Sequence, residues 1–126
     1  MEPLKIKESE ATPKIVLDKG NNIFEISGIS LPEDVFTFFA PVFKWIEEYI
    51  KEPNPAMEFV VKLTYFNTAS SKIILDILLK LEELKKKGLD VSISWYHLDM
   101  DEDILSTGKE FESMLNIPFK FISFIQ

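Results

Sequence analysis

Phe59-Val60-Val61-Lys62-Leu63-Thr64-Tyr65-Phe66 is the stretch that decides the fold, because a helix start follows it at once. Its apolar, β-branched and aromatic residues are typical of a buried strand. The polar run Asn67-Thr68-Ala69-Ser70-Ser71 comes next, and Lys72–Lys87 then has apolar residues at helical spacing. A buried strand therefore turns directly into an amphipathic helix. The stripe expected to be buried on this helix comprises Ile74, Ile77, Leu78, Leu81 and Leu84.

The junction at residues 67–71 brings hydroxyl and amide side chains to a helix N-terminus. The first backbone N–H groups of a helix lack helical partners, and the helix dipole favours negative charge there. A phosphate group, bound or covalently attached, would find hydrogen-bond donors at this position. Asn67 and Thr68 are also ordinary helix-capping residues, so a purely structural role is the alternative. We take this junction as the candidate functional site.

Further strands and a further helix are predicted on both sides of the junction. Lys14–Asp18 and Asn22–Ser27 have the character of two strands joined by a tight turn. Val91–His97 and Pro118–Ile125 are the predicted strands of the second half. Asp101–Leu115 is a predicted helix with acidic residues in its first turn, where the helix dipole favours them. Gly108 is unfavourable inside it.

The segment before the junction predicts a helix interrupted by proline. Ser30 and Glu33 have the spacing of a capping box. Pro41 cannot lie inside a helix without a kink. We therefore expect a short helical segment followed by a helix from Pro41 to about Lys51. The side chains expected to be buried on that helix are Phe43, Ile46 and Ile50.

This order of elements predicts an α/β fold with a mostly parallel sheet of about five strands and helices packed on the sheet. The two strands before residue 28 add an N-terminal antiparallel hairpin. Phe59–Phe66 and Val91–His97 are expected to be central strands covered on both faces, because both are continuously apolar. Residues 13–126 are predicted to form one domain, and residues 1–12 a tail or a short edge strand.

The composition limits the classes of function. The 126 residues include no cysteine and have a net charge of −7, which argues against nucleic-acid binding because phosphate contacts need a basic face. No apolar stretch is long enough to span a membrane, and the N-terminus lacks the apolar core of a signal peptide. We expect a cytoplasmic domain without membrane attachment.

Partial patterns of two other chemistries are present. The acidic run from Asp99 to Asp103 resembles a calcium loop, but Ile104 stands where such a loop needs glycine. A Ser–His–Asp arrangement of Ser70, His97 and Asp99 lacks the nucleophile elbow of such enzymes. A small hydrolase or ligand-binding module that uses the same junction is the alternative function.

The large aromatic residues are either core or partner surface: Trp45, Tyr49, Trp95 and Tyr96.

Several stretches together resemble the SiaC family of bacterial regulatory phosphoproteins, over roughly residues 12–124. The junction carries the most specific part of the resemblance. The matching stretches are Gly28–Asp34, Pro41–Tyr49, Tyr65–Lys72, Trp95-Tyr96 and Asp101-Glu102-Asp103. The resemblance implies a fold like that of STAS domains, the anti-sigma-factor-antagonist type, and no catalysis or cofactor. It also implies partner switching: a GHKL-type kinase phosphorylates a threonine, a PP2C-type phosphatase removes the phosphate, and the unmodified form binds a diguanylate cyclase.

The resemblance assigns the phosphoacceptor role to Thr68. Ser70 and Ser71 are alternative acceptors, because Asn67 replaces the aspartate of anti-sigma-factor antagonists and no glycine is nearby. The residues predicted to contact a partner are Asn67, Ala69, Ser70, Ser71, Trp95, Tyr96 and Asp101. No metal ligands are predicted.

Overall fold

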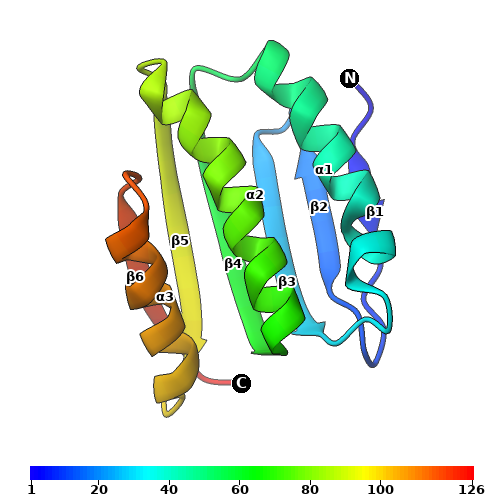
Figure 1. Cartoon of the computed structure of the whole chain (residues 1–126), viewed down its shortest axis with the longest axis vertical. Helices are drawn as coiled ribbons and strands as arrows, with labels where there is room; N and C mark the ends of the chain where they lie inside the picture. Colours follow the sequence, from blue (N-terminus) through cyan, green and yellow to red (C-terminus); the bar gives the residue numbers. More distant parts are fainter.

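The computed structural model describes residues 1–126 and contains one sheet of six strands covered by three helices (Figure 1). The strands lie in the order β1-β2-β3-β4-β5-β6, with β1, β2 and β3 antiparallel and β3 to β6 parallel. The predicted mixed α/β fold with an N-terminal antiparallel hairpin is confirmed. The elements are β1 (Leu4–Ile6), β2 (Lys14–Asp18), β3 (Ile23–Ser30), α1 (Val35–Lys51), β4 (Ala56–Phe66), α2 (Thr68–Lys86), β5 (Asp90–Leu98), α3 (Glu102–Met114) and β6 (Phe119–Phe124).

All three helices lie on one face of the sheet (Figure 1). Each helix connects a parallel strand to the next strand in the sheet, and right-handed connections in a constant direction place every helix on the same side. The prediction that β4 and β5 are inner strands is confirmed. The prediction that both faces are covered is wrong. In β4 the buried positions Met57, Phe59, Val61 and Leu63 alternate with more exposed ones, as expected of a strand covered on one face.

The helix α1 is continuous, although the sequence predicts a break at Pro41. Phe39 and Val42, on either side of the proline, are fully buried. Burial of apolar side chains on both sides of Pro41 outweighs the one helical hydrogen bond that proline cannot donate. The predicted capping box at Ser30 is also wrong, because Ser30 ends β3 and Asp34 is the helix N-cap.

The buried face of α1 differs from the predicted one. Trp45 and Tyr49 lie in the core, stacked on each other with ring centroids 5.3 Å apart. Of the three predicted positions, Ile46 is buried, whereas Phe43 and Ile50 are only partly buried. The helix is therefore turned toward its larger aromatic side chains, which remove more apolar surface from water. Trp45 and Tyr49 are core residues and not partner surface.

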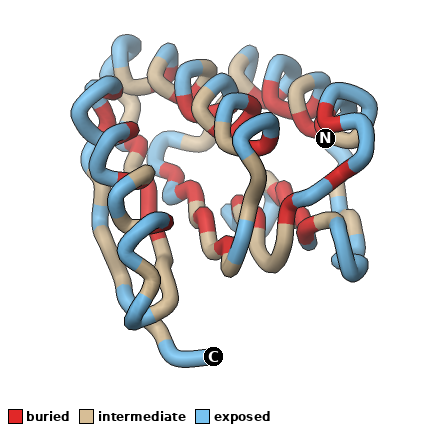
Figure 2. The backbone as a smooth tube through the Cα atoms, turned by 60° about the horizontal axis from the view of Figure 1, so that its bottom comes forward, coloured by how far each residue is buried: buried red, intermediate tan, exposed pale blue.

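The core is one apolar cluster between the sheet and the helices. Buried positions recur along the helices and strands, with exposed positions between them (Figure 2). The predicted stripe of α2 is confirmed in full, since Ile74, Ile77, Leu78, Leu81 and Leu84 are all buried. None of the helices combines the length and the apolar character needed to cross a membrane.

The pairing of β3 with β4 contains a β-bulge near the carboxyl ends of the two strands. The register shifts between Gly28 and Ile29 and skips Thr64 of β4. Gly28 has a φ of +100°, a conformation that side-chain-bearing residues rarely adopt. A bulge redirects the side chains that follow it. Here Phe66 packs against the core, whereas Tyr65 is 55% exposed.

Candidate functional site

The junction forms the first turn of α2. Asn67 is the N-cap, and its Oδ1 accepts a hydrogen bond from the backbone N–H of Ser70 at 2.8 Å. Its backbone oxygen accepts from the N–H of Ser71 at 3.0 Å. The helix therefore begins at Thr68, four residues before the predicted Lys72, because the cap extends it through the polar run.

Thr68 is exposed on this first turn, and so is Ala69. As the first two helical residues, they have N–H groups without intrahelical partners. The cap side chain occupies only the N–H of Ser70. The turn therefore combines an accessible hydroxyl, two available N–H donors and the positive end of a helix dipole. Such a turn accommodates a phosphate group.

Ser70 and Ser71 differ from Thr68 in accessibility. Ser70 is 0% exposed, and its hydroxyl donates to the backbone oxygen of Ser30 at 3.0 Å. A kinase cannot reach a hydroxyl in this position, so the alternative acceptor Ser70 does not fit the structure. Ser71 is half-buried. The Ser–His–Asp arrangement of Ser70, His97 and Asp99 is not formed. The Ser70 hydroxyl bonds to Ser30, and His97 Nδ1 lies beside the backbone oxygen of Leu98.

The remaining predicted contact residues fall in three different places. Trp95 is fully buried and donates from Nε1 to the backbone oxygen of Ile104 at 2.9 Å. The prediction that Trp95 contacts a partner directly is therefore wrong. Tyr96 points to the opposite face of β5, the uncovered face of the sheet, where the Lys62 ammonium lies 5.2 Å from its ring centroid. Asp101 is the N-cap of α3 and accepts from the N–H of Ile104 at 3.0 Å.

Exposed apolar side chains lie at the carboxyl edge of the parallel strands, which we define as the ends of β3 to β5 with the loops and first helical turns that follow. They are Leu31, Phe36, Tyr65 and Met100, with exposed fractions of 36%, 74%, 55% and 89%. Tyr65 also lines a hollow of about 240 Å³ with Asp101 and Asp103. Sequence reasoning missed these residues, and the exposure of Tyr65 in particular depends on the bulge.

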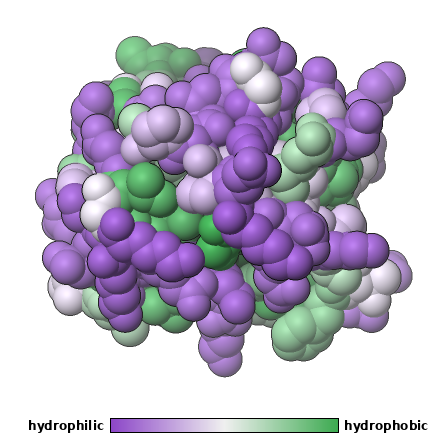
Figure 3. Space-filling model, turned by 90° about the horizontal axis from the view of Figure 1, so that it is seen from above, coloured by the Kyte–Doolittle hydropathy of each residue, from purple (hydrophilic) through white to green (hydrophobic).

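The carboxyl edge is also acidic. Its segments 31–36 and 99–103, which include the starts of α1 and α3, contain no lysine. Their acidic residues are Glu33, Asp34, Asp99, Asp101, Glu102 and Asp103. The opposite edge, seen from above in Figure 3, is mainly hydrophilic. Exposed apolar groups within a charged rim are typical of protein interfaces, so this edge is the candidate partner surface.

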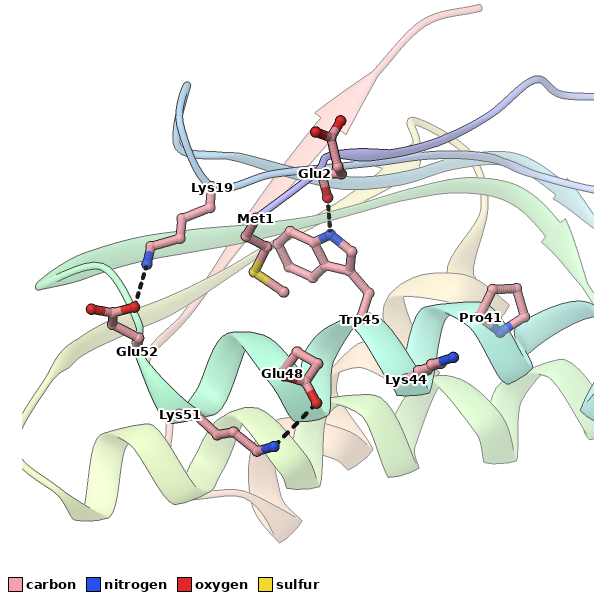
Figure 4. A pocket seen from close by; sticks show the side chains of 9 residues that line it. All are labelled: Met1, Glu2, Lys19, Pro41, Lys44, Trp45, Glu48, Lys51 and Glu52. Atoms are coloured by element: carbon pink, nitrogen blue, oxygen red, sulfur yellow. Dashed lines mark hydrogen bonds and ion pairs between the residues drawn. The ribbon is translucent and has the colours of Figure 1, made fainter.

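A second hollow, of about 660 Å³, lies far from this edge between α1 and the N-terminus (Figure 4). Trp45 Nε1 donates to the backbone oxygen of Glu2 at 2.8 Å and so ties the N-terminal segment to α1. The ammonium groups of Lys19 and Lys51 pair with the carboxylates of Glu52 and Glu48. Two of the lysines that line this hollow are thus paired with carboxylates, and we keep the carboxyl edge as the candidate site.

Comparison with known proteins gives one consistent result. The sequence model of "SiaC family regulatory phosphoprotein" matches residues 6–124. An uncharacterised protein of Pseudomonas aeruginosa strain UCBPP-PA14 is 31% identical over 119 residues, covering 94% of both chains. The structure of SiaC of Pseudomonas aeruginosa is similar with a TM-score of 0.89 and 29% identity, covering 98% of this chain and 100% of that one.

A further similar structure contains a partner. It is the complex of the diguanylate cyclase SiaD with its activator SiaC from Pseudomonas aeruginosa. The similarity has a TM-score of 0.89 and 30% identity, and it covers 96% of this chain and 99% of that one.

Proposed function

The chain belongs to the SiaC family of regulatory phosphoproteins, and from this premise we propose that it is a non-enzymatic partner-switching protein controlled by phosphorylation of Thr68. Its unmodified form binds and regulates an output protein such as a diguanylate cyclase. The observation that carries the proposal is the position of Thr68 as the exposed first residue of α2. The hydroxyl is accessible to a kinase, and the turn around it suits the product.

The modification is a phosphoryl transfer from ATP. The Thr68 hydroxyl oxygen attacks the γ-phosphorus, the bond to the β-γ bridging oxygen breaks, ADP leaves, and the hydroxyl proton passes to a base of the kinase or to solvent. In the reverse direction, water attacks the phosphorus and inorganic phosphate leaves while the threonine oxygen takes up a proton. A GHKL-type kinase and a PP2C-type phosphatase perform the two steps. Both act in the cytoplasm, where ATP is available.

The phosphate is compatible with the fold of this chain. It adds a charge of about −1.5 to −2 beside a helix N-terminus, where the dipole and the N–H groups of Thr68 and Ala69 offset it. The dianion does not enter the core, because Thr68 is exposed. Phosphorylation therefore leaves the chain folded.

The output partner has no such compensation. In the unmodified form it covers the apolar side chains of the carboxyl edge, including Tyr65 and Met100, together with the exposed part of the α2 turn. A dianion at the centre of this contact would lose its hydration and would add to an edge that is already acidic. Burial of an uncompensated charge costs several kcal/mol, so the phosphorylated form releases the partner.

Phosphosite mapping tests the acceptor. The purified chain is incubated with ATP and the cognate GHKL-type kinase, digested and sequenced by mass spectrometry. We expect phosphate on Thr68 alone and none in a Thr68→Ala variant. Phosphate on Ser71 would move the acceptor, and an unmodified chain after exhaustive incubation would contradict the proposal.

The rival function, a small hydrolase or ligand-binding module at the same junction, has less support. The buried Ser70 hydroxyl bonds to Ser30, and His97 lies beside a backbone carbonyl. No nucleophile–base pair is therefore assembled at the turn. Ester turnover that is lost in Thr68→Ala would favour the rival.

A further inference from the structure

Two serine hydroxyls meet in the core directly behind the Thr68 turn. Ser30 ends β3 and Ser70 lies in the first turn of α2, yet both are 0% exposed. The Ser30 hydroxyl donates to Ser70 Oγ at 2.8 Å, and the Ser70 hydroxyl donates to the backbone oxygen of Ser30 at 3.0 Å. We propose that this Ser30–Ser70 pair is a positioning device that holds Thr68 in place for phosphoryl transfer. The proposal rests on the proposed function.

The backbone oxygen of Ser30 anchors both sides of Thr68. On one side, the backbone N–H of Asn67 donates to the oxygen of Ser30 at 3.3 Å. On the other side, the hydroxyl of Ser70 reaches the same oxygen. Thr68 lies between these two anchors, exposed but attached to the end of β3 through its neighbours. An exposed helix start without such anchors would fray.

The two hydroxyls are the part of this arrangement that ordinary capping does not require. The Asn67 side chain already caps the helix by accepting from the N–H of Ser70. A buried hydroxyl pair is less favourable than an apolar contact unless both groups are satisfied, and here both are. The pair adds directional hydrogen bonds between β3 and α2, which apolar side chains cannot supply.

Orientation of the acceptor matters for the transfer step. The hydroxyl oxygen must stand in line with the breaking phosphorus–oxygen bond, and small displacements of a reacting group reduce rates by up to about 100-fold. The pair is buried and is not part of the surface that a kinase can contact. Loss of the pair should therefore lower kcat for Thr68 phosphorylation and leave KM for this chain nearly unchanged.

The direction of the hydrogen bonds in the Ser30–Ser70 pair decides which variants test its role. Ser70→Ala removes the acceptor of the Ser30 hydroxyl and leaves a buried donor unsatisfied. The double variant Ser30→Ala with Ser70→Ala removes both hydroxyls, so no polar side chain is left unsatisfied and folding is less affected. Ser94→Ala is the matched control, because Ser94 is 1% exposed and bonds to Glu58 on β4, away from α2.

Two measurements on each variant test the proposal. Hydrogen exchange of the unmodified chain is expected to be at least about tenfold faster at the N–H groups of Asn67, Ser70 and Ser71 in Ser70→Ala and in the double variant, and unchanged there in Ser94→Ala. With a GHKL-type kinase and ATP, kcat is expected to fall about 10- to 100-fold with KM within about twofold.

Equal exchange at these N–H groups in the wild type and in both Ser70 variants would overturn the proposal. An equal kcat in Ser70→Ala and Ser94→Ala would overturn it as well. If the wild-type chain accepts no phosphate on Thr68, the proposed function fails. The exchange measurement then decides separately whether the pair orders the turn.

Discussion

Gly108 lies so close to Trp95 that a Cβ atom on it would stand 2.6 Å from the indole Nε1. Trp95 Nε1 donates to the backbone oxygen of Ile104, so the ring lies directly against α3. Glycine, which lowers helix propensity, is therefore required at this position for close packing of α3 on β5. The helix retains it because removal of Trp95 from water outweighs the propensity loss.

Gly108→Ala should destabilise the chain, although alanine is the better helix former. The gain in propensity is about 1 kcal/mol, whereas forcing a methyl group into the indole costs about 1–3 kcal/mol or more. We expect a net loss of at least about 1 kcal/mol in the free energy of unfolding, measured in urea. Ser106→Ala on the exposed side of α3 serves as control. A Gly108→Ala variant more stable than the wild type would contradict the packing described for Trp95.

Ile77→Ala should be strongly destabilising because Ile77 is 0% exposed on the inner face of α2. Truncation of such a side chain leaves a cavity and costs about 2–5 kcal/mol. Leu79 is 42% exposed on the same helix, so Leu79→Ala should cost less than about 1 kcal/mol. Similar losses for the two variants would mean that α2 does not bury this face.

Asp34 should make the stability of α1 sensitive to acid. Its carboxylate accepts hydrogen bonds from the N–H of Thr37 at 3.1 Å and from the Thr37 hydroxyl at 2.7 Å. These bonds favour the charged form, and that of the Thr37 hydroxyl is the main cause that lowers the pKa of Asp34. The contribution is therefore present above the pKa of the unfolded chain and is lost as the pH falls through the lower pKa of the folded chain.

The matched variant is Asp34→Ser, since serine caps a helix without titrating in this range. The stability difference between the wild type and this variant should stay constant from about pH 7 to pH 5 and should shrink below about pH 4. The pKa of Asp18 is also lowered by hydrogen bonds from Asn21, but Asp18 is present in both the wild type and the variant, so its titration cancels in the difference. Urea denaturation at each pH measures the difference. A difference that persists to pH 2 would show that Asp34 does not act through its charge.

The sequence predicted the elements whose signals are local and repeated. The predictions of the buried stripe of α2 and of the strand Lys14–Asp18 are confirmed. Errors arose where tertiary contacts decide. The continuity of α1 through Pro41 depends on burial of Phe39 and Val42 against the sheet. One face of the sheet is uncovered because the strands follow one another in chain order, which places every helix on the same side. The apolar residues alone do not specify this strand order.

The candidate site likewise contains residues that a local sequence signal predicts and residues whose surroundings depend on tertiary contacts. The turn with Asn67 and Thr68 was predictable, because capping residues at a strand–helix junction are a sequence signal. The burial of Ser70 was not, since it depends on Ser30, forty residues away in the chain. The exposure of Tyr65 was not predictable either, because a bulge that skips one residue reverses the alternation of the strand.

Met100→Ala should weaken binding of the output partner. Met100 is 89% exposed on the acidic carboxyl edge, whereas Met114 is 58% exposed at the other end of α3. Only a minority of interface residues cost more than about 1 kcal/mol when truncated, which is roughly fivefold in affinity, and Met100 is the most exposed large apolar side chain of this edge. We expect at least that loss for Met100→Ala and none for Met114→Ala in a titration with a diguanylate cyclase of the same organism. Equal losses for the two methionine variants would place the contact elsewhere.

The most direct test compares the affinity of the Thr68-phosphorylated and unmodified chains for that diguanylate cyclase by calorimetric titration. Circular dichroism of both forms provides the control for folding. We predict that phosphorylation lowers the affinity at least about 100-fold, corresponding to about 2.7 kcal/mol or more, while both forms stay folded. Thr68→Ala should bind like the unmodified chain. Equal affinity of the two forms, or loss of affinity that follows unfolding, would contradict the switch at Thr68.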